Sequence, residues 1–182
     1  ITVIGSGSWG TALAVMLHKY GHDVTIWSYK EEEAERIRRD GEHKEFLPGV
    51  KIDPAIGIVT DPKEAVQGRE ILVTAIPSNC VRTNWGKFTP YLTSEQVIVN
   101  VAKGLEEGSL LRLSEVIASC VPGCPVCTLV GPSHAEEVAR DIPTACCVGG
   151  ADMAAAEMIQ KEFMNPNFRI YTNDDVIGME LG

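Results

Sequence analysis

Three glycines near the start of the chain stand at a spacing that suits phosphate binding. Gly5, Gly7 and Gly10 form a Gly-x-Gly-x-x-Gly pattern directly after the short apolar run 1–4. The first glycine permits a tight turn, the second lets phosphate oxygens approach the backbone, and the third lets the following helix lie close to the sheet. The free amides and positive dipole end of that helix bind anions without a basic side chain. The pattern predicts a dinucleotide site, and the alternative is a glycine turn that holds no ligand.

A second set of polar residues follows later apolar runs. Lys103 comes directly after the run 96–102. Its ammonium could hold a phosphate or stabilise negative charge on a carbonyl oxygen, and the alternative is an ordinary surface lysine. Gly131 and Ser133 offer an amide and a hydroxyl to the same ligand, although Gly-Pro-Ser is also common at helix starts. His134 is a candidate acid or base, with a solvated histidine as the alternative.

The residues after the second apolar run bear on which dinucleotide binds. In folds that bind NAD, an acid about 20 residues after the glycines often hydrogen-bonds the ribose. Here Ser28, Tyr29 and Lys30 occupy that place, and Glu31 comes several residues late. These three side chains suit the 2′-phosphate of NADP instead. The sequence therefore predicts NADP or NAD as the cofactor, with NADP favoured.

Five of the six cysteines fall in two groups that resemble a metal site at first sight. Cys120, Cys124 and Cys127 lie close together, and Cys146 and Cys147 follow. The first group lacks the paired spacing of a zinc knuckle and has no nearby histidine. Its members are expected near a helix end, in a connection and at a strand start. We expect thiols packed in a reducing compartment and no metal site.

The composition indicates a globular domain and argues against two classes of partner. The chain has 182 residues, of which 45% are hydrophobic and 23% are charged. A net charge of −9 and a pI near 4.9 argue against a nucleic-acid or anionic-membrane surface. No apolar run reaches membrane-spanning length and no secretory signal is visible. The expectation is a cytoplasmic protein with no nucleic-acid partner and no integral membrane segment.

Strand-like apolar runs alternate with helix-like segments along the chain, which is typical of a parallel sheet with crossover helices. The expected strands are 1–4, 23–27, 57–60, 70–77, 96–102, 126–130, 145–148 and 168–171, and the expected helices are 11–20, 31–40 and 152–163. Pro77 is expected to end its strand. The pattern predicts an α/β, Rossmann-type, doubly wound and mainly parallel sheet that forms one domain over residues 1–182.

Four loops are expected at one edge of this sheet. Ligands of open α/β sheets bind outside the carboxyl ends of the strands. The loops 5–10, 77–78, 103–104 and 131–135 all follow strands at that edge. The sequence therefore predicts that the glycine-rich turn, Pro77, Lys103 and the Gly-Pro-Ser turn surround one ligand.

Five motifs, in order, resemble those of NAD(P)-dependent glycerol-3-phosphate dehydrogenase, the bacterial type most closely. They are Gly5-Ser-Gly-Ser-Trp-Gly-Thr-Ala-Leu-Ala14, Phe46-Leu-Pro-Gly-Val50, Val101-Ala-Lys-Gly-Leu105, Gly131-Pro-Ser-His-Ala135 and Phe168-Arg-Ile-Tyr171. The resemblance covers essentially the whole chain. It implies an oxidoreductase with a small-molecule phosphate substrate, which interconverts dihydroxyacetone phosphate and sn-glycerol 3-phosphate by hydride transfer, for glycerophospholipid synthesis.

The resemblance and the predicted loops together imply a set of site residues. The expected cofactor contacts are Gly5, Gly7, Ser8, Trp9, Gly10, Tyr29, Lys30, Pro77, Lys103 and Ala135. The expected substrate contacts are Lys103, Gly131 and Ser133, and Lys103 is the expected catalytic group.

The family's proton-acceptor lysine and its helical substrate domain are expected beyond Gly182. Hydride transfer at a secondary alcohol also needs a group that takes the proton. Residues 1–182 alone are therefore expected to bind cofactor but to turn over slowly or not at all, and the full-length enzyme is a candidate homodimer. The alternatives are another Rossmann dehydrogenase of a small hydroxy or keto acid, and a noncatalytic nucleotide-binding module.

Overall fold

A computed structural model describes all residues from 1 to 182. The strands are β1 (Thr2–Ile4), β2 (Thr25–Trp27), β3 (Gly57–Val59), β4 (Ile71–Thr74), β5 (Val97–Asn100), β6 (Val126–Val130), β7 (Thr144–Gly150) and β8 (Phe168–Thr172). The helices are α1 (Ser8–Lys19), α2 (Glu31–Asp40), α3 (Pro62–Val66), α4 (Val81–Phe88), α5 (Leu113–Cys120), α6 (Ala135–Val138), α7 (Met153–Phe163) and α8 (Val176–Leu181). Two 3₁₀ helices, η1 (Ser78–Cys80) and η2 (Thr89–Tyr91), flank α4.

All eight strands form one sheet in the order β3-β2-β1-β4-β5-β6-β7-β8. Every neighbouring pair is parallel except β6 and β7, which run antiparallel. The first six strands follow the order of a doubly wound dinucleotide-binding sheet. The predicted fold class, a Rossmann-type and mainly parallel sheet, is confirmed.

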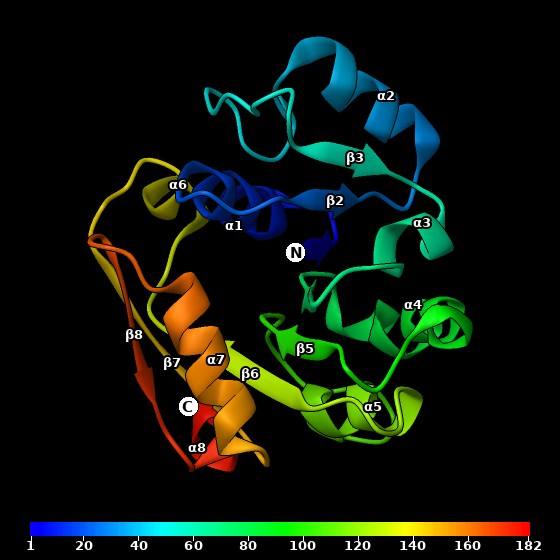
Figure 1. Cartoon of the computed structure of the whole chain (residues 1–182), viewed down its shortest axis with the longest axis vertical. Helices are drawn as coiled ribbons and strands as arrows, with labels where there is room; N and C mark the ends of the chain where they lie inside the picture. Colours follow the sequence, from blue (N-terminus) through cyan, green and yellow to red (C-terminus); the bar gives the residue numbers. More distant parts are fainter.

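Apolar cores cover both faces of the sheet, as expected for strands buried on two sides. One core contains residues of α1, α2 and α7, such as Leu17, Ile37 and Phe163. The other contains residues of α3, α4 and α5, with Trp85 and Phe88 fully buried. Figure 1 shows α1 and α7 on one side of the sheet and α3, α4 and α5 on the other. None of these helices is both long enough and apolar enough to cross a membrane.

Several predicted boundaries are wrong by a few residues. Helix α1 begins at Ser8 rather than at residue 11, because the glycine-rich turn already supplies its N-cap. Strand β4 ends at Thr74, so Pro77 does not end the strand but precedes η1. Strand β2 begins at Thr25, since Asp23 lies at the surface and pairs with Arg69 at 2.7 Å.

Helix α8 is fixed to α5 by one carboxylate. The Glu180 side chain is only 4% exposed. It accepts hydrogen bonds from Arg112 Nη1 at 3.1 Å, the Ser114 amide at 3.0 Å and the Ser114 hydroxyl at 2.5 Å. Such charge-assisted contacts hold α8 across the carboxyl edge of the sheet, where its residues line a cavity.

Candidate active site

The four loops predicted to meet at the carboxyl edge of the sheet do lie together. They surround a cavity of about 370 Å³. Its lining residues are Ser8, Trp9, Ala75, Ile76, Pro77, Ser78, Val101, Ala102, Lys103, Ser133, His134, Ala135 and Glu136. Ser8, Trp9, Pro77, Lys103 and Ala135, all predicted cofactor contacts, therefore share one cavity.

The glycine-rich turn has the geometry of a phosphate cradle. A Cβ on Gly7 would meet no atom within 4 Å, so open space lies before the N-terminus of α1. No side chain caps this helix, and its first turn carries no acid. The first amides of a helix have no partner within it and are free to bind an anion. These residues fit the pyrophosphate of a dinucleotide.

The other two glycines of the turn are required by packing. Gly5 has a φ of +122°, and a Cβ there would lie 2.3 Å from the Ala75 carbonyl oxygen. A Cβ on Gly10 would lie 2.2 Å from the Gly5 carbonyl oxygen. The turn, α1 and the residues after β4 are therefore in close contact, as the spacing of the motif predicts.

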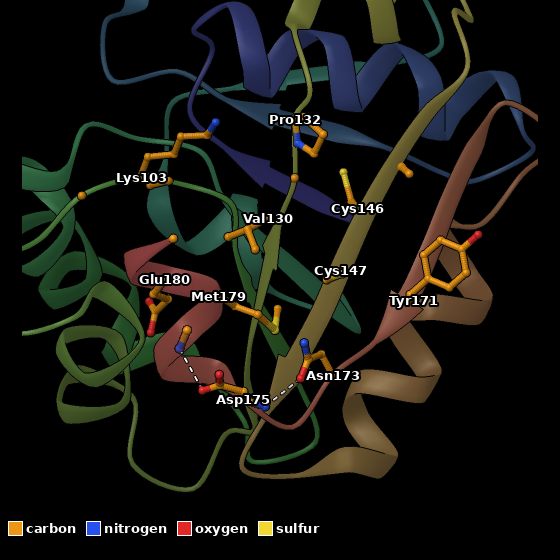
Figure 2. A pocket seen from close by; sticks show the side chains of 16 residues that line it. Lys103, Val130, Pro132, Cys146, Cys147, Tyr171, Asn173, Asp175, Met179 and Glu180 are labelled. Atoms are coloured by element: carbon orange, nitrogen blue, oxygen red, sulfur yellow. Dashed lines mark hydrogen bonds between the residues drawn. The ribbon is translucent and has the colours of Figure 1, made fainter.

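Lys103 lies between the first cavity and a larger one of about 740 Å³, and it lines both. The larger cavity lies among the ends of β5, β6, β7 and β8 and helix α8 (Figure 2). Its lining residues are Ala102, Lys103, Gly104, Val130, Gly131, Pro132, Ala145, Cys146, Cys147, Tyr171, Asn173, Asp175, Gly178, Met179, Glu180 and Gly182. The Lys103 ammonium makes no hydrogen bond or ion pair within the protein, so it is free to contact a ligand from either side.

The Gly-Pro-Ser turn contributes to both cavities. Gly131 lines the larger one, and Ser133, His134 and Ala135 line the smaller one. A Cβ on Gly131 would lie 2.6 Å from the Ala145 carbonyl oxygen, so close packing against β7 requires glycine there. Ser133 thus lies among the predicted cofactor contacts, although it was expected to contact substrate. His134 is exposed, and its side chain makes no hydrogen bond.

Tyr29 and Lys30 lie away from both cavities, beyond the end of β2. Both are exposed, and Lys30 forms no ion pair. The Nζ of Lys87, from α4, lies 4.5 Å from the centre of the Tyr29 ring, within the range of a cation–π contact. The sequence analysis missed Lys87, because α4 approaches β2 only in the folded chain.

The sequence analysis also missed Glu33 in the first half of α2. Its Oε1 accepts hydrogen bonds from Ser28 at 2.9 Å and from Ser6. Ser6 stands between the first two glycines, and Ser28 follows β2. An acid therefore reaches the turn from a helix, where the linear spacing showed none.

The Phe46-Leu-Pro-Gly-Val50 motif packs against residues that line the smaller cavity. Leu47 is fully buried and Val50 is 8% exposed. They form a small core with Ala12 of α1 and Ala135 of α6, and Trp9 packs against it. The motif therefore fixes two elements that line the cavity.

The three cysteines of the first group occupy the expected elements: Cys120 ends α5, Cys124 lies in the connection that follows and Cys127 lies near the start of β6. Burial raises the pKa of Cys127 to about 12. Burial also raises the pKa of Cys146 to about 11, against the opposing effect of the Lys103 charge. Both thiols therefore stay protonated and unreactive at neutral pH.

Comparison with known proteins identifies a family. The family described as NAD-dependent glycerol-3-phosphate dehydrogenase N-terminus matches residues 1–156. Glycerol-3-phosphate dehydrogenase [NAD(P)+] of Agathobacter rectalis is 46% identical over 182 residues, which are all of this chain and 54% of that protein. The corresponding protein of Bacillus subtilis is 40% identical over 185 residues, again across the whole chain and 54% of that protein.

A solved structure agrees with this result. The crystal structure of glycerol-3-phosphate dehydrogenase from Coxiella burnetii matches with a TM-score of 0.93 and 30% identity, over 99% of this chain and 55% of that one. The chain thus spans about half the length of the relatives it matches. Its fold, its glycine-rich turn and these similarities show that the chain belongs to the NAD-dependent glycerol-3-phosphate dehydrogenase family, whose N-terminal region it matches.

Proposed function

We propose that this chain is the cofactor-binding part of an enzyme that interconverts dihydroxyacetone phosphate and sn-glycerol 3-phosphate with NAD(H) or NADP(H). The observation that carries the proposal is the position of Lys103, free of internal partners, between the cavity beside the glycine-rich turn and the larger cavity. A dehydrogenase needs such a junction, because the nicotinamide and the carbon that exchanges the hydride must meet. The family membership of the chain supports the same reaction.

The site residues have distinct proposed roles. Gly5, Gly7 and Gly10 admit the pyrophosphate to the start of α1, and Ser8, Trp9, Pro77 and Ala135 line the cofactor cavity. The bound cofactor supplies or accepts the hydride. Lys103 contacts both cofactor and substrate, and its charge stabilises the negative charge that develops on the carbonyl oxygen during reduction. Gly131 and Ser133 are proposed to contact the substrate from the turn after β6.

The proton and the remaining substrate contacts are assigned to another region. Reduction of the ketone adds a hydride to carbon and a proton to oxygen, and Lys103 alone is not expected to supply both orientation and proton transfer. We place the proton-transferring lysine in the part of the relatives that this chain does not match. A cytoplasmic homodimer whose product enters phospholipid synthesis completes the proposal, on the basis of the family resemblance.

A parallel assay of substrates tests the reaction. The intact protein, meaning the full-length enzyme proposed to contain this chain, is incubated with NADH or NADPH. Dihydroxyacetone phosphate, pyruvate or ketopantoate is added, and the loss of absorbance of the reduced nicotinamide is followed. We expect oxidation of NADH or NADPH when dihydroxyacetone phosphate is present and no oxidation with the other two ketones. Oxidation with a carboxylated ketone alone would assign the chain to a different dehydrogenase. Cofactor binding without any turnover would favour a noncatalytic nucleotide-binding module.

Replacing Lys30 tests the proposed contact at the adenosine end of the cofactor. Lys30→Glu turns an exposed cation beyond β2 into an anion. We expect the Kd of NADPH to rise about tenfold and the Kd of NADH to change less than about twofold, since only NADPH carries the 2′-phosphate. Titrations that follow nicotinamide fluorescence measure both constants. Equal changes in the two constants would contradict the contact.

A further inference from the structure

Glu33 is held at the glycine-rich turn by two serines from different elements. Its Oε1 accepts hydrogen bonds from Ser28, at 2.9 Å, and from Ser6. The two hydroxyls also contact each other, at 3.2 Å. Ser6 is 6% exposed and Ser28 is fully buried. The carboxylate is therefore anchored over the start of the turn and the end of β2.

The Glu33 carboxyl group is expected to be ionised at neutral pH. Burial alone would raise the pKa of Glu33, but the hydrogen bonds from Ser6 and Ser28 and the nearby charge of Arg36 hold it below its ordinary value. The Glu33 side chain is 15% exposed. An anion thus lies beside the turn with little water around it.

His43 lies beside Glu33 Oε1, and the other oxygen of the Glu33 carboxylate makes no hydrogen bond. The Nδ1 of His43 accepts the amide of Phe46 at 3.4 Å, so the proton of the neutral ring is assigned to Nε2. That Nε2 is buried, has no hydrogen-bond partner and lies 3.8 Å from Glu33 Oε1. Both hydrogen bonds of the carboxylate therefore fall on Oε1, and Oε2 makes none.

We propose that Glu33 is a specificity-determining residue that favours NAD(H) over NADP(H). In dinucleotide-binding folds the ribose beside the adenine lies over the end of the second strand, where an acid accepts a hydrogen bond from its 2′-hydroxyl. Glu33 supplies this acid from α2 instead of from the strand itself. Its Oε2 accepts the ribose hydroxyl of NAD(H), and its charge repels the 2′-phosphate of NADP(H).

This inference changes the assignment of the residues after β2. The Ser28 hydroxyl was expected to suit a 2′-phosphate, but it is buried and already donates to Glu33. Lys30 and Lys87 remain as exposed or half-buried cations at this end of the site, and they oppose the effect of Glu33 without contacting it. The inference rests on the cofactor assignment of the proposed function, but not on the identity of the substrate.

The test is Glu33→Gln in the intact protein, with the Kd of NADH and of NADPH measured by nicotinamide fluorescence. Glutamine keeps the shape and can still accept from both serines, so the fold is retained. We expect NADPH to bind about tenfold more tightly and NADH to bind no more tightly than before, because one repulsive charge is removed. Glu32→Gln is the matched control, since it removes the same charge from an exposed side chain that makes no hydrogen bond or ion pair. The ratio of the NADH and NADPH constants should stay within about twofold in this variant.

Three outcomes would overturn the inference. The first is an equal change of both constants in Glu33→Gln, which would leave Glu33 with a purely structural role. The second is an equal shift of the ratio in Glu32→Gln, which would indicate a general charge effect. The third uses the adenosine halves of the cofactors: AMP and 2′,5′-ADP compete with NADH on the unchanged protein and on Glu33→Gln, and an unchanged ratio of their two constants would contradict the role of Glu33 at the ribose. Failure of both NADH and NADPH to bind would instead reject the proposed function itself.

Discussion

Replacing Gly7 with alanine is expected to weaken NADH binding about 100-fold, which is about 2.7 kcal/mol, while the fold stays intact. The added Cβ meets no protein atom within 4 Å, so it projects into the space proposed for the pyrophosphate. A methyl group there keeps phosphate oxygens away from the amides at the start of α1. Titration calorimetry measures the loss of binding, and circular dichroism checks the fold.

Stability separates this effect from a general disturbance of the turn. Gly7 has an ordinary φ of −63°, so we expect Gly7→Ala to change the free energy of unfolding by less than about 1 kcal/mol. Gly5→Ala is the contrasting variant, because its φ is +122° and its Cβ would lie 2.3 Å from the Ala75 carbonyl oxygen. We expect Gly5→Ala to lose about 3 kcal/mol. Unchanged NADH affinity in a folded Gly7→Ala protein would contradict the phosphate site.

Replacing Lys103 with methionine is expected to lower kcat/KM for dihydroxyacetone phosphate about 1000-fold, which is about 4 kcal/mol of transition-state stabilisation. Methionine keeps much of the side-chain length and removes the ammonium that lies between the two cavities. The Kd of NADH is expected to change less than tenfold, since the glycine-rich turn supplies most of the phosphate contacts. Steady-state rates of the intact enzyme and a separate NADH titration check the two expectations.

Lys161→Met is the control for this variant. Lys161 is exposed on α7, lines neither of the two cavities and forms no ion pair, so its replacement removes the same charge at a distance. Its kcat/KM should stay within about twofold of the unchanged protein. A Lys103→Met enzyme that retains its kcat/KM would show that Lys103 is an ordinary surface lysine.

The glycine-rich turn and the sheet could be predicted from local sequence, for a clear physical reason. Apolar runs of four to eight residues that alternate with helix-like segments favour a parallel sheet, because its strands are buried on both faces and its crossovers are helices. Gly10 is required because a Cβ there would lie 2.2 Å from the Gly5 carbonyl oxygen within the same motif, and the φ of +122° at Gly5 is a property of the turn itself. Information of this kind is local, and the structure confirms the fold class and the meeting of the four loops.

Boundaries depended on contacts that the linear sequence does not contain. The sequence analysis used Pro77 as a strand end, but hydrogen bonding to neighbouring strands ends β4 at Thr74. It gave no direction for the run 145–148, which becomes β7 and pairs antiparallel to β6. Pairing with both neighbours extends this strand to Thr144–Gly150.

By itself, the sequence determined that the chain folds as a doubly wound sheet, that a phosphate-binding turn follows its first strand, and that Lys103 stands at a carboxyl edge. Only the tertiary structure decided what these residues face. It brought Glu33 from α2 onto Ser6 and Ser28, although the residues that directly follow β2 include no acid. It also placed Lys103 between two cavities. The physical reason is that spacing along a strand or helix reports neighbours on one element, whereas charge and cavity shape arise where separate elements pack together.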